Sequence, residues 1–199
     1  MTAQGAIPTT AIDHHHLAFD NTAPAVSLVP LVEGAQGTWQ TLNAMRDCVL
    51  GQVPPDYSGY QDEFNIRASK SICAQGSSPG HGAQRQIAAL FNYCAHKIQY
   101  LEHPINQQVC QDARRTIEIG SGDCVSLSVL LSTLLACLGY HSRFVAQCLD
   151  GNDYSHVYVE VLTPDGNWLA LDPVARDKPM GWSQPVLDGG FSTTRMIFT

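Results

Sequence analysis

The segment that most constrains the fold of this chain lies past its middle and is apolar on nearly every side. Residues 124–138 contain no charged side chain, and their leucines fall on nearly all faces of a helical projection. A helix of this kind cannot lie at a surface and has to be enclosed by other elements. Gly139 follows it and predicts where the helix ends. We therefore predict a central helix over residues 124–138.

The hydrophobic period changes from helical to alternating after this helix. Residues 143–149, 156–162 and 167–171 show the period of two that is typical of β-strands. The sequence Thr163-Pro164-Asp165-Gly166 predicts a turn between the last two strands. Helices followed by antiparallel strands are typical of an α+β fold, which is the fold class we predict.

Weaker helical patterns precede the central helix. We expect Thr38 to cap a first helix that ends before Gly51, and we predict two more helices at about 62–74 and 82–99. Residues 101–122 are polar and irregular, so no regular element is predicted there. The helices are thus expected to gather in the first part of the chain and the strands in the last.

The N-terminal residues have a different character from the rest. Residues 1–36 are rich in Ala, Thr and Pro and show no sustained period, which predicts an extended arm. Residues 37–199 are predicted to form one domain, for which the length is sufficient. Such an arm is either disordered or ordered only against a partner, and we favour the second because residues 26–32 are too apolar for a free tail.

The composition of the chain argues against several classes of protein. Only 15% of the residues are charged, the formal net charge is -7, and no cluster of Lys and Arg occurs, so we expect no nucleic-acid partner. No apolar run reaches the roughly 18 residues that span a membrane. The N-terminus lacks the basic and apolar parts of a secretory signal. We therefore expect no membrane span and no secretion by a signal peptide.

Cysteine is common in this chain, so a reactive cysteine has to be recognised by its surroundings. The number of cysteines is seven, which is odd, and most lie in apolar segments. Reduced and mostly buried thiols are therefore expected rather than a disulfide framework. The cysteines are Cys48, Cys73, Cys94, Cys110, Cys124, Cys137 and Cys148.

Cys124 stands out among them because it begins the central helix. A flexible Gly-Ser-Gly approach precedes it, and Asp123 is a good N-cap candidate. Unpaired backbone N–H groups and the helix dipole favour a thiolate in the first turn. The same N–H groups can stabilise an oxyanion formed by attack on a carbonyl. The alternative is a small apolar residue at a helix start, as other cysteines here are expected to be.

His156 and Asp172 lie on the two strands of the predicted hairpin. With a two-residue turn, Asp172 faces Val157. With a three-residue turn and one bulge in the second strand, Asp172 lies beside His156. Directly opposed residues have Cβ atoms only about 5 Å apart, so Asp172 can reach the imidazole. The carboxylate would then fix the tautomer of the ring and stabilise the imidazolium. The sequence itself does not bring Cys124 to His156.

Several motifs resemble the transglutaminase-like branch of the papain-like superfamily. The resemblance implies a Cys124 nucleophile, a His156 general base and acid, and an Asp172 that orients the ring. It also implies N-terminal helices, with the cysteine starting a central helix that packs on an antiparallel sheet. The motifs are Gly122-Asp123-Cys124, the leucine-rich helix ending in Leu138-Gly139-Tyr140, Ser142-Arg143-Phe144-Val145, residues 155–161 and residues 168–173.

A closer resemblance is to the transglutaminase-like proteins of tailed bacteriophages and prophages. It rests on Ile98-Gln99-Tyr100, Arg114-Arg115-Thr116-Ile117 and Lys178-Pro179-Met180-Gly181-Trp182. The resemblance implies a peptide or amide substrate and a location in the phage virion or the host cytoplasm. No cofactor or metal is expected. Many relatives carry polar residues after the cysteine, where this chain has Val125-Ser126, so contacts there are not transferred.

Two classes of function follow from these expectations. The first is a cysteine enzyme that hydrolyses or transamidates amide or peptide bonds, in which case Cys124 is expected to alkylate fastest at mildly acidic to neutral pH. The second is a virion structural or assembly protein with a vestigial site, whose subunits would meet through the N-terminal arm. A particle component can also be an enzyme, so the two are compatible.

Several further side chains are candidates for minor roles. Gln107, Gln108 and Trp39 are candidates for completing an oxyanion hole. Cys94, His96, His103 and Cys110 have ligand chemistry, but their spacing fits no common zinc site. His14–His16 is expected to be solvated, as is Arg114-Arg115. Trp168 and Trp182 are expected in the core or the wall of the site.

Overall fold

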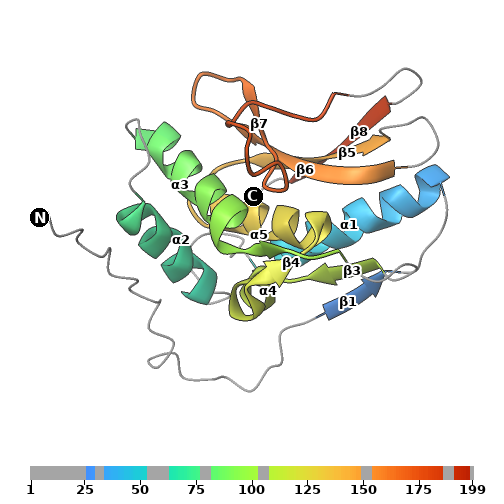
Figure 1. Ribbon diagram of the computed structural model, residues 1–199, viewed down its shortest axis with the longest axis horizontal. Helices are drawn as coiled ribbons and strands as arrows, with labels where there is room; N and C mark the ends of the chain where they lie inside the picture. The colour runs from blue at the N-terminus through green and yellow to red at the C-terminus, as the bar shows by residue number, and fades with distance from the viewer. Residues whose placement is uncertain are drawn as a thin grey trace, which may run out of the picture.

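The central helix of the chain lies between a four-stranded sheet and a set of smaller elements (Figure 1). The computed structural model describes residues 26–29, 34–52, 63–76, 82–102, 108–148, 154–185 and 191–197. Helices pack on one face of the sheet, and the strands of that sheet are all antiparallel to their neighbours. This arrangement confirms the predicted α+β class, with the cysteine-bearing helix central and packed on an antiparallel sheet.

Helix α5 (Cys124–Ala136) is the predicted central helix. The side chain of Asp123 caps it by accepting a hydrogen bond from the backbone N–H of Ser126 at 2.8 Å. Every residue after Cys124 in this helix is buried, as an apolar surface on all sides requires. Gly139 follows with a φ of 83°, and the N–H of Tyr140 returns to the carbonyl of Leu135. This Schellman-type ending confirms the predicted end of the helix.

Three further helices surround α5: α1 (Gly34–Gln52), α2 (Glu63–Gln75) and α3 (Gly82–Lys97). The predictions for α2 and α3 are confirmed, but the predicted limits of α1 were wrong. Thr38 is not the cap of α1, and Gly51 lies inside the helix. Gly51 does not have the positive φ that ends a helix, so nothing in its backbone stops α1 before Gln52.

The main sheet has the strand order β7-β6-β5-β8. Its inner face packs against the leucines of α5 through Phe144, Ala146, Val157, Val159, Val161 and Leu171. The alternation of the sequence predicted three of these strands but not β8. The strands are β5 (Ser142–Cys148), β6 (Tyr154–Leu162), β7 (Trp168–Leu171) and β8 (Phe191–Ile197).

The stretch predicted to be irregular contains short regular elements. Strand β3 (Gln108–Gln111) pairs antiparallel with β1 (Val26–Val29), which lies within the predicted arm. Strand β4 (Ser121–Gly122) pairs in parallel with β2 (Gln99–Tyr100). Helix α4 (Ala113–Ile119) lies between β3 and β4. These elements are too short to produce a readable period, so the prediction missed them.

Candidate active site

Cys124 is the first residue of α5, where strand β4 runs directly into the helix. The two elements pass very close to each other at Gly122. A Cβ atom on Gly122 would lie 2.7 Å from the Cβ of Ser126, which is closer than real side-chain carbons approach. One turn further along, the Oγ of Ser128 donates to the backbone carbonyl of Val157 at 3.3 Å. The start of α5 is therefore fixed against both β4 and β6.

The thiol of Cys124 is harder to ionise than a free thiol. Burial raises its pKa to about 12, and the negative charge of Asp123 adds to the increase. Hydrogen bonds from the backbone N–H groups of Val157, Val125 and Cys124 itself act in the opposite direction. The helix N-terminus predicted a depressed pKa, so that expectation was wrong. The N–H groups are present as expected, but desolvation outweighs them.

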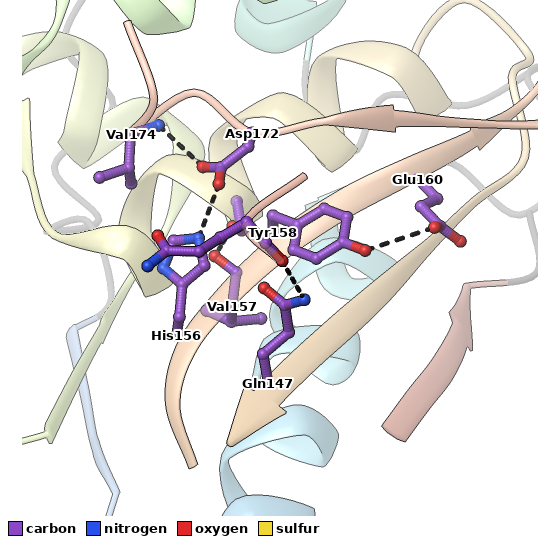
Figure 2. A network of polar contacts seen from close by, with 9 residues as sticks. Gln147, His156, Val157, Tyr158, Glu160, Asp172 and Val174 are labelled. Atoms are coloured by element: carbon purple, nitrogen blue, oxygen red, sulfur yellow. Dashed lines mark hydrogen bonds and ion pairs between the residues drawn. The ribbon is translucent and has the colours of Figure 1, made fainter. Parts of the chain in front are cut away.

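His156 and Asp172 form a direct hydrogen-bonded pair (Figure 2). The Nε2–H of the imidazole donates to Oδ2 of the carboxylate at 2.8 Å. The other oxygen, Oδ1, accepts from the backbone N–H of Val174 at 3.1 Å. Both side chains are shielded from solvent, with exposed fractions of 10% and 2%. The carboxylate is thus held on both of its oxygens, and it in turn holds the ring.

The register of the hairpin explains how this pair forms. Val159 lies opposite Leu171, and Leu162 lies opposite Trp168. This register belongs to the three-residue turn of 164–166, in which Gly166 has the positive φ of 84° that such turns require. The paired residues show no bulge between β6 and β7. Continuing the register would place Asp172 opposite Tyr158 rather than beside His156, so the carboxylate reaches the imidazole along a diagonal.

The sulfur of Cys124 lies at the same end of strand β6 as the imidazole. The backbone N–H of Val157 is a hydrogen-bond donor to the sulfur, and Val157 directly follows His156. Since Nε2 is engaged with Asp172, Nδ1 is the ring nitrogen that remains for proton exchange. The structure therefore brings the three predicted residues to one end of the hairpin and the start of α5.

Polar and aromatic side chains of β5 and β6 lie near the imidazole (Figure 2). Tyr158 stacks on His156 with ring centroids 6.2 Å apart, and its hydroxyl lies 3.5 Å from Oε1 of Glu160. Gln147 lies opposite His156 in the sheet and donates to the backbone carbonyl of Gln184 at 3.0 Å. The ring of Tyr158 is therefore the aromatic neighbour of the imidazole, while Gln147 holds the segment at Gln184 beside this strand.

Tyr100 also lies in this region, although no sequence pattern identifies it as part of the site. Burial raises the pKa of its hydroxyl to about 12, and the electrostatic influences of Cys124, Glu102, Asp123 and Asp172 raise it further. The phenol is therefore within electrostatic range of the cysteine and of the aspartate. The position of Tyr100 beside the segment that leads into Cys124 follows only from the pairing of β2 with β4. No period in the sequence predicts such a short strand.

The other candidates have less connection with this site. Trp39 lies on α1 with an exposed fraction of 41%. Gln107, the side chain of Gln108 and His14–His16 lie outside the described residues. Trp168 lies under the guanidinium of Arg143, 4.3 Å from its ring centroid.

The ligand-type side chains do not converge on a metal site in the described ranges. Cys94 is buried in α3 whereas His96 is exposed, so the two face different surroundings. His103 lies outside the described residues. Among the residues that the structure describes, no group of three or more His, Cys, Asp or Glu side chains could hold a metal ion. In the same ranges, no helix combines the length and the apolar character needed to cross a membrane.

Arg114 departs from the solvated position that was expected for it. Its guanidinium lies over the ring of Phe64, 5.4 Å from the centroid, and its Nε donates to Glu118 at 2.9 Å. The side chain is only 22% exposed. It therefore links α4 to α2 instead of forming a free basic face.

Solved structures of low sequence identity resemble this chain. A candidate protease from Parabacteroides distasonis is 13% identical with a TM-score of 0.49, over 66% of this chain and 26% of that one. A candidate cysteine protease from Cytophaga hutchinsonii is 16% identical with a TM-score of 0.48, over 77% and 57%. LapG from Legionella pneumophila is 15% identical with a TM-score of 0.42, over 74% of each chain. The chain thus spans less than two thirds of the first two proteins.

A comparison with curated proteins gave no match. The family model described as the transglutaminase-like superfamily, however, matches residues 70–173, which is just over half of the chain. The matched region includes Cys124 and His156 and ends directly after Asp172. The chain belongs to the transglutaminase-like superfamily.

Proposed function

We propose that this protein is a cysteine acyl-transfer enzyme that acts on amide or peptide bonds. Cys124 is the nucleophile, His156 the general base and acid, and Asp172 the residue that orients the imidazole. The observation that carries the proposal is the 2.8 Å bond between His156 and Asp172 at the end of β6 where the N–H of Val157 meets the Cys124 sulfur. Membership of the family supports the same chemistry.

The reaction begins with a neutral thiol, because burial keeps the pKa of Cys124 near 12. A thiolate in this position needs an adjacent positive charge, and the imidazolium of His156 supplies it when Nδ1 takes the thiol proton. Proton transfer therefore accompanies attack on the substrate carbonyl. Asp172 accepts from the Nε2–H throughout and stabilises the charged ring.

Collapse of the tetrahedral intermediate completes acylation. The C–N bond of the substrate breaks, Nδ1–H of His156 protonates the departing amine, and the acyl group stays on sulfur as a thioester. Water or an amine then attacks the thioester, with His156 acting first as base and then returning the proton to sulfur. Water gives hydrolysis of the amide or peptide, and an amine gives transamidation. The N–H groups at the start of α5 are donors for the oxyanion.

An electrophilic probe tests the proposal without knowledge of the substrate. A peptidyl aldehyde is expected to form a hemithioacetal at Cys124 in the wild-type protein and to fail with Cys124→Ala. His156→Ala is expected to bind it far more weakly. Cys73→Ala serves as the control, because Cys73 lies on α2 and its sulfur contacts Gln86. Binding is measured on the intact adduct by native mass spectrometry, and equal binding by wild type and Cys124→Ala would contradict the proposal.

Association with phage particles is a further part of the proposal. A location in the virion or the host cytoplasm rests on the sequence resemblance. The partner of the arm was predicted from the apolar residues 26–32, of which 26–29 pair with β3 of this chain. Deletion of residues 1–25 leaves strand β1 and its pairing with β3 in place. If the arm binds virion subunits, this deletion abolishes incorporation into particles while the activity of Cys124 persists. Normal incorporation of the deleted protein would contradict this part.

A further inference from the structure

We propose that the hydroxyl of Tyr100 donates a hydrogen bond to the oxyanion that forms on the substrate carbonyl. This inference rests on the acyl-transfer function proposed above and adds a residue to its machinery. No sequence motif points to this role, and three features of the structure support it: the pairing of β2, an anchor beside Asp172, and the electrostatic surroundings of the phenol.

The backbone of Tyr100 is fixed beside the segment that leads into the nucleophile. Tyr100 lies opposite Gly122, two residues before Cys124, in the parallel pairing of β2 and β4. The N–H of Gln99 donates to Gly120 at 2.8 Å, and the N–H of Leu101 donates to Gly122 at 3.0 Å. Hydrogen bonds on both sides of Tyr100 therefore hold its position relative to the start of α5.

The same strand is anchored to the segment that follows Asp172. The guanidinium of Arg176 donates to the backbone carbonyl of Ile98 at 2.6 Å. The N–H of Ala175 returns to the carbonyl of Asp172 at 3.2 Å, which connects the anchor to the aspartate. Strand β2 thus joins the element that carries the cysteine to the element that carries the aspartate, and Tyr100 lies between these two attachments.

The electrostatic surroundings suit a hydrogen-bond donor. The pKa of Tyr100 is raised to about 12. Burial is the largest cause, and Cys124 and nearby carboxylates, which include Asp172, raise the pKa further. The phenol therefore keeps its proton throughout the neutral range. An O–H on a strand that is fixed beside the segment leading into the cysteine can donate to an oxygen that becomes negative during attack. Tyr100 is only half-buried, so a substrate can approach it.

The test compares two reactions of Cys124 that differ in whether an oxyanion forms. Acylation by p-nitrophenyl acetate passes through a tetrahedral oxyanion, whereas alkylation by iodoacetamide does not. Tyr100→Phe removes only the hydroxyl, and we expect it to slow acylation roughly 10²-fold while alkylation stays unchanged. Both rates are read at the peptide that contains Cys124 by mass spectrometry.

Tyr93→Phe is the matched control, because Tyr93 on α3 also has a pKa raised to about 12, by burial and then by Cys94. It is expected to change neither rate. If Tyr100→Phe leaves acylation unchanged, or slows acylation and alkylation equally, the proposed role of Tyr100 is wrong. If wild-type Cys124 alkylates but is not acylated, the acyl-transfer function itself fails, and this inference fails with it.

Discussion

The two halves of the site are prepared for reaction to different degrees. In the sheet half, His156 and Asp172 are already joined at 2.8 Å, and a backbone N–H from Val174 holds the second carboxylate oxygen. In the helix half, burial and the charge of Asp123 hold the pKa of Cys124 near 12. The acid–base groups are thus in place before substrate arrives, whereas the nucleophile has to be generated at the moment of attack.

The difference follows from what each half requires to fold. A hairpin can bury a carboxylate and an imidazole together because each satisfies the other. The start of α5 needs a cap, and Asp123 provides it through Ser126 at 2.8 Å. The charge that caps the helix also opposes a negative sulfur beside it. Folding therefore favours a negative charge at the start of α5, whereas formation of a thiolate there requires a positive charge nearby. The imidazolium of His156 supplies this positive charge.

The largest effect is expected from removing the base. In His156→Ala nothing can take the proton of a thiol whose pKa is about 12, so acylation of Cys124 by p-nitrophenyl acetate should fall roughly 10⁴-fold. Mass spectrometry at the Cys124 peptide measures this rate, and labelling of Cys73 in the same samples is the control. If the rate falls less than tenfold, the thiol reacts without the imidazole. The nucleophile would then not depend on the His156–Asp172 pair for its activation.

A smaller loss is expected when the imidazole is kept but its tautomer is changed. In Asp172→Asn the N–H of Val174 would hold the amide oxygen, so the NH₂ group would face Nε2. The ring would then carry its proton on Nδ1, which could no longer accept from sulfur, and acylation should fall roughly 10³-fold.

Asp172→Ala is the companion variant, because it leaves both tautomers accessible. It should lose less activity than Asp172→Asn in the same acylation assay. Equal losses in the two variants would mean that the carboxylate acts through its charge alone and not by selecting the tautomer.

The sequence predicted the parts of this molecule that have long and uniform patterns. The central helix was predicted because fifteen consecutive uncharged residues end at a glycine, and the hairpin because alternation continues on both sides of Pro164-Asp165-Gly166. The pairing of β2 with β4 could not be predicted, because two residues carry no period and the pairing depends on the packing of α4 and α5. Tyr100 was missed as a site residue for that reason.

The chemistry of Cys124 shows the same limit. Its position at a helix start was readable from the sequence, and the N–H groups there do lower its pKa. The amount of burial around the sulfur was not readable, because it depends on how closely β4 and β6 approach the helix. Burial gives the larger contribution, so the predicted sign of the shift was wrong.

The close passage of β4 and α5 can be tested with one methyl group. Gly122→Ala would put a Cβ 2.7 Å from the Cβ of Ser126, so the strand or the helix start has to move. We expect a loss of about 1–3 kcal/mol in the free energy of unfolding, measured by urea denaturation. Acylation of Cys124 should fall as well, because the same movement displaces the sulfur and the backbone of Gly122, which pairs with Tyr100.

Gly76→Ala is the matched control for this substitution. Its Cβ would lie 2.8 Å from the Cβ of Ala89, at a contact between the end of α2 and helix α3. It should cost a similar free energy of unfolding without slowing the reaction of Cys124. If both variants slow acylation to the same extent, the effect comes from general destabilisation and not from the passage beside the site.

The smallest effect is expected from Asp123, and it tests why the helix half resists ionisation. Asn caps a helix about as well as Asp but carries no charge, so Asp123→Asn should keep α5 and lower the pKa of Cys124. Below its pKa, the thiolate fraction increases about tenfold with each pH unit, so alkylation by iodoacetamide should rise steadily from pH 7 to pH 10 in the wild type. The variant should follow the same curve at lower pH and react a few-fold faster at pH 9.

Asp112→Asn is the control, since Asp112 caps α4 by accepting from the N–H of Arg115 at 2.6 Å and is not among the charges that raise the pKa of Cys124. Equal alkylation profiles for wild type and Asp123→Asn would assign the resistance to burial alone, and the cap would then have no part in the difference between the two halves.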